Sequence, residues 1–484
     1  MCGIVAVFGN DTYLIAETAL NKIKHRGKDE TKLLQLPFGT IGFNRLSIND
    51  KTDKGMQPFE FGNLAGAFNA EIYNAEELKE KFDLITHSNS DTEIILPLFE
   101  KIGISIIHQL DGFYSGIIFN KETNQLFTLR DYIGKKPFFY SKTQQFEFIT
   151  SELKAVEHLT EFEIIPKGVC EVSNKKVAIV AEHKIPVVSK NNLKEIIINA
   201  VKRRIPKEEE AFGVFLSGGL DSSIVAAIVS KYSEKAIFYT LGNSETLDLK
   251  FVIEFSNTLN IANRLKIISI PVENEIPDLI ENVVYHTESY NPSIVSNGLA
   301  TFLLSKAAHE DGIKVVLSGE GADELFCGYP ISKNADEWLA KRTELIGNMH
   351  FTELRRLDFA SMANTIEIRC PFLDRSVFGA SNECLQNDLI ETTNGNLQGK
   401  KILRELFYDD LPKAIAERNK VSFDVGSGIR KVVVEHLAKS GTSEEDSLKA
   451  IWLKYFPANI SDDNYFRSYP TFDKAIANRS TIHK

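Results

Sequence analysis

Short apolar runs separated by turn residues dominate the chain up to about residue 185. Runs of this length that are rich in β-branched and aromatic residues predict strands. Helical patterns are fewer there, and the longest covers residues 91–106. We therefore expect an α+β domain built on antiparallel sheets, and its clearest strands lie at residues 40–43, 64–68, 114–119 and 137–140.

The pattern changes after residues 184–192, which read as a linker. Apolar strands now alternate with helical stretches, which is typical of a parallel sheet in an α/β domain. The last third of the chain has a mostly helical pattern. We therefore predict two domains, at residues 1–187 and 188–484, and the strands of the second are expected at residues 213–216, 237–241, 265–270 and 313–317.

A glycine-rich segment, Ser-Gly-Gly-Leu-Asp-Ser-Ser, occupies residues 217–223 between the first of these strands and an apolar helical pattern. Glycines at this point bring backbone N–H groups and a helix N-terminus against an anion, as a nucleotide phosphate requires. Asp221 could then hold the magnesium ion that accompanies the phosphates. The segment lacks the Gly-Lys-Ser/Thr ending of a P-loop, which disfavours a kinase-type or GTPase-type site. A purely structural turn is the alternative interpretation.

A second polar segment follows the strand at 313–317. It lies beyond the carboxyl end of a parallel strand, where open α/β sheets usually bind their ligands. Its sequence, Ser-Gly-Glu-Gly-Ala-Asp-Glu at 318–324, crowds three carboxylates beside two glycines. The alternative is a solvated acidic loop, but such a loop needs no glycines next to a buried strand. The charges at 367–374 and 417–420 lie beside apolar residues, and there a structural ion pair is the stronger interpretation.

Composition excludes several classes of protein. The 484 residues are 43% hydrophobic and 25% charged, as globular folding requires, and the net charge of -10 argues against a general nucleic-acid binder. The five cysteines show neither metal-ligand spacing nor a disulfide framework, which indicates a reducing compartment, and we expect the cytoplasm. We find no signal sequence and no 18-residue apolar stretch, so no membrane segment is expected.

Cys2 directly follows the initiator methionine. Removal of Met1 would make it the N-terminal residue, whose α-amine could act as general base for its own thiol. The reference pKa values, about 8 for the amine and about 8.5 for the thiol, are close enough for that transfer near neutral pH. Polar islands in the same domain, at residues 25–27, 44–47, 69–71 and 90–93, could complete such a site.

Taken together, these motifs resemble the glutamine-hydrolysing asparagine synthetases over nearly the whole chain. The family pattern of Met-Cys-Gly-Ile, His-Arg-Gly, Arg-Leu-Ser-Ile, Asn-Gly-Glu-Ile-Tyr-Asn, Ser-Gly-Gly-Leu-Asp-Ser and Ser-Gly-Glu-Gly-Ala-Asp-Glu-Leu occurs here in order, with alanine for glycine at residue 70. The resemblance implies an N-terminal-nucleophile amidotransferase domain, a four-layer αββα fold, followed by an ATP-pyrophosphatase-type synthetase domain.

In the first domain, the resemblance implies that Cys2 attacks the side-chain amide of glutamine. Asn69 and the backbone N–H of Ala70 would form the oxyanion hole. Arg45 would pair with the α-carboxylate of glutamine and Asp91 with its α-ammonium, and Glu71 completes the implied glutamine-binding set. The ammonia would pass internally to the second domain.

In the second domain, the resemblance implies that ATP adenylates a carboxylate acceptor with release of pyrophosphate. The implied ATP-binding residues are Leu216, Ser217, Gly218, Gly219, Asp221, Ser222, Ser318 and Gly319. Asp221 and Asp323 would hold Mg²⁺, Glu320 would lie near the acceptor intermediate, and Arg356 and Lys420 would neutralise phosphate charge. The expected partners are small molecules, with neither nucleic acid nor membrane involved, and a homodimer is a further expectation.

The segment 289–297 departs from the family pattern. Where the relatives to which we align it have Thr-Tyr-Asp-Val-Thr-Thr-Ile-Arg, this chain places Ser296 near the position of the arginine associated with aspartate. A buried substrate carboxylate favours a bidentate arginine, so either another cation substitutes or the acceptor differs. Asparagine synthesis is the first hypothesis, amidation of another carboxylate such as a uronic acid or a biosynthetic intermediate the second, and an inactive structural or regulatory homologue the third.

Overall fold

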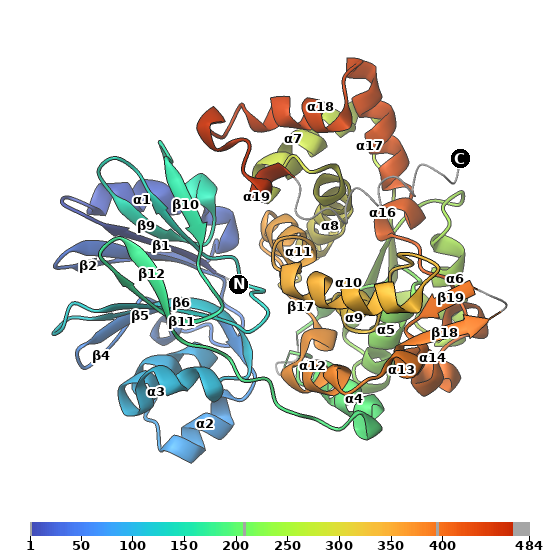
Figure 1. Cartoon of the computed structure of the whole chain (residues 1–484), viewed down its shortest axis with the longest axis horizontal. Helices are drawn as coiled ribbons and strands as arrows, with labels where there is room; N and C mark the ends of the chain where they lie inside the picture. The colour runs from blue at the N-terminus through green and yellow to red at the C-terminus, as the bar shows by residue number, and fades with distance from the viewer. Residues whose placement is uncertain (1, 207–209, 394–395, 468–484) are drawn as a thin grey trace. The chain divides into compact units, whose positions relative to one another are not determined.

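The computed structural model describes residues 2–206, 210–393 and 396–467, which form two compact units. The first unit runs to Lys184 and also includes Tyr455–Ser461, and the second comprises Ile185–Lys454 and, of the residues described after Ser461, 462–467. Within these described ranges no helix combines the length and the apolar character needed to cross a bilayer. Figure 1 labels many of the elements of both units.

Two six-stranded sheets build the first unit, and every strand pairing in them is antiparallel. The antiparallel sheets predicted from the sequence are thus confirmed. The first sheet has the order β10(Glu161–Ile164), β8(Phe139–Lys142), β9(Glu147–Thr150), β1(Gly3–Phe8), β3(Gly39–Arg45), β2(Glu30–Leu36). The second has the order β12(Lys176–Ala181), β11(Gly168–Ser173), β7(Leu126–Arg130), β6(Gly112–Asn120), β5(Leu64–Ile72), β4(Phe59–Phe61).

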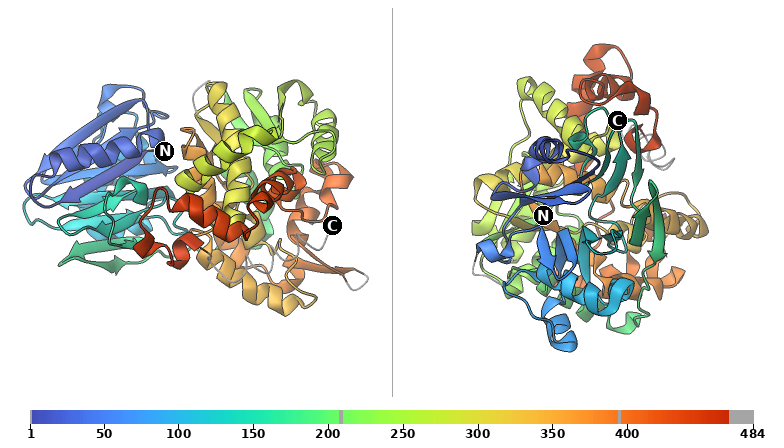
Figure 2. Two further views of the ribbon diagram at one scale, coloured as in Figure 1. Left: turned by 90° about the horizontal axis from the view of Figure 1, so that it is seen from above. Right: turned by 90° about the vertical axis from the view of Figure 1, so that its left-hand side faces the viewer.

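The two sheets pack face to face, and helices cover their outer faces. Alternating side chains of β1 and β3 meet those of β5 and β6 in one core, which includes Ile4, Phe43 and Ala67. A second core lies between β5–β6 and the helices α2(Ala75–Phe82) and α3(Ile95–Ile102), and α1(Tyr13–Lys22) packs on β1 and β3. Figures 1 and 2 show α1 and the α2–α3 pair on opposite sides of the two sheets, which gives the expected four layers.

The single long helix predicted over residues 91–106 is wrong. The structure divides it into a 3₁₀ turn at Asp91–Ile94, helix α3 and a second 3₁₀ segment at Gly103–His108. Gly103 has φ +58°, a positive angle that glycine adopts readily, and helix α3 ends there. The apolar periodicity continued across this glycine, and the prediction therefore did too.

A five-stranded parallel sheet forms the centre of the second unit, as the alternating pattern predicts. Its order is β15(Leu265–Ile268), β14(Ala236–Leu241), β13(Phe212–Phe215), β16(Val315–Leu317), β17(Glu367–Arg369). The strand β17 was not predicted, because it is short and carries two charges. Those charges pair with each other, since Arg369 Nε donates to Glu367 Oε1 at 2.8 Å and both side chains are buried.

Helices make up most of the remaining second unit, which confirms the helical pattern of the last third. They are α4(Leu193–Lys202), α5(Leu220–Tyr232), α6(Leu249–Thr258), α7(Ile276–Thr287), α8(Pro292–Glu310), α9(Ala322–Leu325), α10(Ala335–Asn348), α11(Glu353–Met362), α12(Arg375–Asn382), α13(Gln386–Leu389), α14(Lys401–Phe407), α15(Lys413–Ala416), α16(Phe423–Gly426), α17(Ile429–Leu437), α18(Glu444–Trp452) and α19(Asn464–Arg467). One hairpin, β18(Ile390–Thr393) and β19(Asn396–Gly399), completes the unit.

Candidate functional sites

The first candidate site surrounds Cys2, at the start of the central strand β1. Its backbone nitrogen donates to Asn69 Oδ1 at 2.9 Å, and its sulfur accepts from the Leu46 N–H at 3.5 Å. The other end of the amide, Asn69 Nδ2, is buried and has no hydrogen-bond partner within the described residues. A buried donor without a partner destabilises the folded protein. This N–H₂ group can therefore donate to an acceptor atom that binds beside the cysteine.

A buried charge cluster anchors the chain behind Cys2. Arg26 Nε donates to the Cys2 carbonyl at 3.0 Å, and Arg26 Nη1 donates to Glu152 Oε1 at 2.7 Å. His25 Nε2 lies 3.0 Å and Lys154 Nζ 2.5 Å from Glu152 Oε2. Burial would raise the pKa of Glu152, but His25, Lys154 and Arg26 hold that pKa well below its ordinary value. Glu152 is thus an anion that holds the His-Arg-Gly turn in place beside Cys2.

Glycine is required in that turn for a steric reason. A Cβ atom on Gly27 would lie 2.5 Å from both the Asn44 carbonyl oxygen and the Arg45 carbonyl carbon. The backbone of residues 25–27 therefore passes directly against the end of β3. Ala70, by contrast, lies within β5 and is not one of the residues with positive φ. Alanine in place of the usual glycine therefore causes no backbone strain here.

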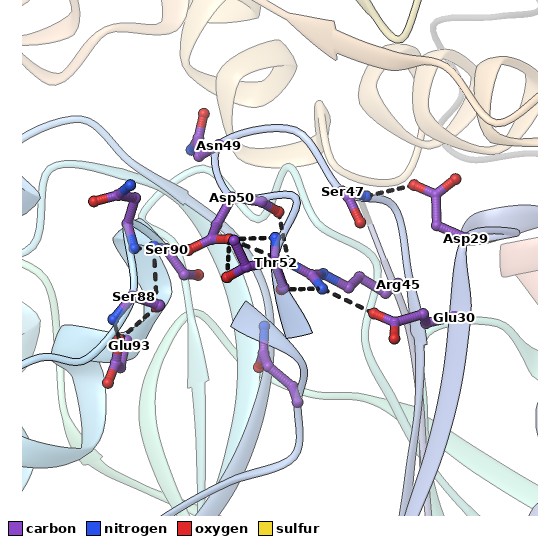
Figure 3. Close-up of polar contacts among 12 residues, drawn as sticks. Asp29, Glu30, Arg45, Ser47, Asn49, Asp50, Thr52, Ser88, Ser90 and Glu93 are labelled. Carbon is purple, nitrogen blue, oxygen red and sulfur yellow. Dashed lines mark hydrogen bonds and ion pairs between the residues drawn. The ribbon is translucent and has the colours of Figure 1, made fainter. Parts of the chain in front are cut away.

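The loop after β3 holds Arg45, one of the predicted glutamine-binding residues, in a network of polar contacts (Figure 3). Arg45 Nη1 donates to Glu30 Oε2 and to the Thr52 carbonyl, both at 2.8 Å, and Nη2 donates to the Asp50 carbonyl at 2.5 Å. Arg45 is therefore already engaged with its own loop. Its neighbour Asp50 accepts from the N–H groups of Thr52 and Asn89, which ties this loop to the segment before Asp91.

Asp91 and Glu71 share one donor. Asn49 Nδ2 lies 2.8 Å from Asp91 Oδ1 and 3.2 Å from Glu71 Oε2, while Asp91 Oδ2 accepts from the Ile72 N–H at 2.6 Å. Asn49 was not among the predicted residues, although it lies close to them along the chain. Two carboxylates therefore meet at this end of the site, and carboxylates are suitable partners for an ammonium group.

The second candidate site lies where the adjacent strands β13 and β16 end. A cavity of about 750 Å³ opens there, and its wall includes residues that follow both strands. The two loops touch, because a Cβ atom on Gly319 would lie 2.7 Å from the Asp221 carbonyl carbon and the Ser222 nitrogen. Gly218 has φ +68°, so it turns the first loop. Both glycine-rich segments thus have a structural requirement for glycine in addition to any ligand.

Four charged groups alternate across this cavity wall. Lys400 Nζ lies 2.5 Å from both Asp221 Oδ2 and Asp323 Oδ1, and Lys420 Nζ lies 2.5 Å from Asp323 Oδ2. Burial would raise the pKa of Asp323, but Lys400 and Lys420 hold it at about 2. Burial raises the pKa of Asp221 above its ordinary value, against the attraction of Lys400.

Asp221 keeps one free coordination position. Its Oδ1 atom is buried and accepts no hydrogen bond from any described residue. The described residues contain no group of three or more His, Cys, Asp or Glu side chains that could hold a metal ion by themselves. A metal at this wall would therefore need ligands from a bound nucleotide, which is the usual arrangement for Mg²⁺.

Another part of the wall carries the acidic residues of the second motif. Glu320 forms an ion pair with Arg356, and Arg356 Nη1 donates to Thr301 Oγ1 of α8 at 3.3 Å. Asp323 and Glu324 are both more than nine-tenths buried. The solvated acidic loop considered from the sequence is therefore wrong.

The structure gathers most of the sequence-predicted residues of the second domain in this one cavity. Its wall includes Leu216, Ser217, Gly219, Asp221, Ser222, Ser318, Gly319, Glu320, Asp323, Arg356 and Lys420, whereas Gly218 shapes the loop without lining it.

Sequence reasoning missed several wall residues, above all Lys400. This lysine is buried and has φ +62°, a left-handed conformation that a side-chain-bearing residue adopts only where its surroundings demand it. Arg418 was seen only as part of a charged segment; it pairs with Asp248 and reaches the Ser217 carbonyl at 3.4 Å. Nothing in the local pattern marks either residue, because each meets its partner through the fold.

Comparison with known proteins gives two family matches. Residues 1–195 match the family described as glutamine amidotransferase domain, and residues 192–350 and 334–455 match the family described as asparagine synthase. Three curated relatives, all described as asparagine synthetase [glutamine-hydrolyzing], cover most of the chain. The protein from Sandersonia aurantiaca is 32% identical and covers 88% of this chain and 87% of its own length. The one from Zea mays is 31% identical, with 88% and 78% covered, and protein 1 from Lotus japonicus is 30% identical, with 92% and 81% covered.

Proposed function

This chain belongs to the glutamine-hydrolysing asparagine synthetases, and we propose that it converts aspartate to asparagine with ammonia taken from glutamine and energy taken from ATP. It is an ATP-dependent carbon–nitrogen ligase with glutamine as the nitrogen donor. The observation that carries the assignment of the synthetase step is the shared cavity. Both glycine-rich motifs line it, and their order along the chain alone does not require them to meet.

Glutamine hydrolysis is assigned to the first unit, residues 1–187 in our proposed division. With Met1 removed, the Cys2 α-amine takes the thiol proton, and the sulfur attacks the amide carbon of glutamine. Ammonia leaves, and water then cleaves the thioester to glutamate. The unpartnered Asn69 Nδ2 and the Ala70 N–H are assigned to the oxyanion that forms in each step.

Recognition of glutamine is assigned to the loop after β3 and its neighbours. Asp91 and Glu71, which share the Asn49 amide, would receive the α-ammonium. Arg45 would bind the α-carboxylate. Since Arg45 already donates to Glu30 and to two carbonyl groups, this role requires one of those contacts to be exchanged for the substrate.

Acceptor activation is assigned to the second unit, residues 188–484 in the same division. The loops at Ser217–Ser222 and Ser318–Gly319 would hold ATP, with the N-terminal end of α5 facing its phosphates. The acceptor carboxylate attacks the α-phosphorus, pyrophosphate leaves, and ammonia then displaces AMP. Lys400 and Lys420 would neutralise charge on the departing pyrophosphate, and Arg356 and Glu320 would lie beside the acceptor.

The residues at the cavity wall fit a magnesium ion. Asp221 offers a buried carboxylate oxygen, Oδ1, without a hydrogen-bond partner among the described residues. Asp323 offers a second carboxylate, and Lys400 pairs with both. Mg²⁺ commonly takes one or two carboxylates together with substrate phosphates. Bound there, it would offset phosphate charge in the adenylation step.

The acceptor is tested by pyrophosphate release from tag-free protein with ATP, magnesium and ammonia, using aspartate and a panel of other carboxylic acids. We expect aspartate to have the highest kcat/KM and mass spectrometry to identify asparagine. If aspartate is inert while another acid is amidated, the aspartate assignment is wrong and the altered segment 289–297 belongs to a different acceptor pocket.

Three further expectations complete the proposal. The five cysteines are free thiols, which supports a reducing compartment such as the cytoplasm. We propose that the partners are small molecules and that nucleic acid is not among them. A homodimer stays a prediction.

A further inference from the structure

Ser296, which stands near the position of the relatives' acceptor-binding arginine, turns away from any ligand in this protein. It is fully buried in α8, and its hydroxyl donates to Asp424 Oδ2 of α16 at 2.8 Å. The side chains of α8 that do line the cavity are Ser293, Ile294, Asn297, Thr301 and Leu304. None of these five is charged, so α8 provides no cation for an acceptor carboxylate.

The cavity wall has six cationic side chains, and each of them has a partner among the described residues. Lys400 and Lys420 bind Asp221 and Asp323, Arg418 binds Asp248, Arg356 binds Glu320, and Arg404 donates to three backbone carbonyls. The sixth is Arg430, in the first turn of α17. Its Nη2 atom is held by Glu444, at 2.8 Å from Oε2.

Arg430 Nη1 is buried and has no hydrogen-bond partner among the described residues. Among the other cavity-lining residues that the structure describes, Asp221 Oδ1 shares that condition, whereas Asp323 Oδ1 lies 2.5 Å from Lys400 Nζ. Asp221 belongs to the end of the cavity already assigned to phosphate and magnesium. The free donor of Arg430 lies on a different element and has no role in the proposed ATP site.

Asp424, a few residues before Arg430 in the sequence, supplies a negative charge. It is 5% exposed, lines the cavity, and accepts from Ser296 Oγ and from the Val425 N–H at 3.0 Å. No lysine or arginine among the described residues forms an ion pair with it, and the nearby charge that it attracts, Arg356, is already paired with Glu320. A buried carboxylate without a directly bonded counter-ion favours a cationic ligand group. The short helix α16 and helix α17 both pack on α8, so Asp424 and Arg430 belong to one side of the cavity.

Aspartate has a matching set of charges. Once its side-chain carboxylate is committed to ATP, a carboxylate and an ammonium remain on the α-carbon, and these need one cation and one anion. We propose that Arg430 binds the α-carboxylate and Asp424 the α-ammonium of the acceptor, so that α16 and α17 replace the arginine absent from α8. This assignment of specificity rests on the proposed use of aspartate.

The test compares aspartate with two analogues, each lacking one of these groups. β-Alanine has no α-carboxylate and succinate has no ammonium. For the wild-type protein and for Arg430→Met, Arg430→Lys and Asp424→Asn, pyrophosphate release with ammonia gives the aspartate KM, the ATP KM and the inhibition constants of both analogues. The matched control is Lys431→Met, which removes a charge from the same helix at a side chain that is 79% exposed.

Arg430→Met should raise the aspartate KM about ten- to hundredfold, the usual effect of losing a charge-assisted hydrogen bond. Because β-alanine has no α-carboxylate, its inhibition constant should stay nearly constant. The variant should therefore no longer bind aspartate more tightly than β-alanine. Asp424→Asn should likewise raise the aspartate KM and leave the inhibition constant of succinate, which has no ammonium group, nearly constant. Arg430→Lys should fall between Arg430→Met and the wild type, and Lys431→Met should match the wild type.

An unchanged aspartate KM in Arg430→Met overturns the assignment of Arg430. An equal loss for aspartate and β-alanine also overturns it, because a structural defect would not distinguish them. If Arg430→Met has no measurable turnover, the shift of its thermal midpoint by aspartate and by β-alanine replaces the kinetic comparison, with the same two outcomes. Failure of wild-type protein to release pyrophosphate with aspartate instead contradicts the proposed function.

Discussion

Single polar atoms carry much of the functional argument in this protein. Asn69 Nδ2 beside Cys2, Asp221 Oδ1 at the end of the cavity proposed to bind phosphate and Arg430 Nη1 on α17 are all buried without a hydrogen-bond partner among the described residues. Each such group costs about 1–3 kcal/mol. Three such groups lower the stability of the folded protein, and each leaves a hydrogen-bonding atom available to a ligand.

Asn69→Ala should lower the glutaminase kcat by about two to three orders of magnitude, because it removes one oxyanion donor. Asn69→Asp is the informative companion variant, since it keeps the acceptor for the Cys2 nitrogen but has no N–H₂ group. Glutamate formation measures both. Near-normal turnover in Asn69→Asp would show that Asn69 only positions the cysteine.

Glu152 should make the stability of the protein depend on pH in the acid range. Its pKa is lower in the folded state than the ordinary value of 4.5, so its stabilising contribution is complete above that value and is lost as the pH falls towards the folded pKa. Glu152→Gln should therefore cost about 3–5 kcal/mol at neutral pH, as for other broken buried ion pairs. This difference should shrink below about pH 4.5.

Urea unfolding of both proteins at a series of pH values measures that difference. Glu157→Gln is the matched control, because Glu157 pairs with Lys22 at the surface with 57% of its side chain exposed. It should cost at most about 1 kcal/mol. A cost for Glu152→Gln that did not vary down to acid pH would mean that packing, not the charge, is what matters.

At the scale of elements, two neighbouring parallel strands explain the position of the synthetase site. β13 and β16 are adjacent, so the loops that follow them meet at one edge of the sheet. The contact between these loops is tight enough to exclude any side chain at Gly319. The helix N-terminus of α5 and the acidic second motif are thereby held against each other.

Gly319→Ala should disturb this contact at a cost of about 1–3 kcal/mol, as for other overpacked positions, and should reduce pyrophosphate release. Gly347→Ala in helix α10 of the same unit is the control. There a Cβ atom meets nothing within 4 Å, and alanine is the better helix former. Thermal unfolding and pyrophosphate assays on both variants test the contact. Equal behaviour of the two would contradict the close approach of the loops.

At the scale of the whole molecule, the chain combines two compact units with separate candidate chemistry. Each unit has its own core and its own set of charged residues. Separate units allow one activity to be removed while the other stays.

A residue left ahead of Cys2 should abolish glutamine use but leave ammonia-dependent synthesis, because only the first site needs a free N-terminal cysteine. Asp221→Asn should do the reverse and spare glutamine hydrolysis while cutting pyrophosphate release. Glutamate and pyrophosphate measured in parallel give both results. Loss of both activities in either protein would contradict two independent sites.

The local pattern of residues is enough to predict the two fold classes, their order along the chain and the strands that carry the motifs. Periodicity and turn chemistry are local properties, and they were wrong mainly where a local exception intervened, as at Gly103 and at the charged strand β17. The glycine-rich segments were visible for the same reason, since their chemistry lies within seven or eight consecutive residues.

Contacts between distant residues depended on the tertiary structure. Lys400 meets Asp221 across 179 residues, and Ser296 meets Asp424 across 128. No local signal marks such pairs, because their energy arises only when the sheet and the surrounding helices have brought the partners together and removed water from them. The motifs therefore indicate the chemistry, while the packing of α8, α16 and α17 determines which charges line the cavity.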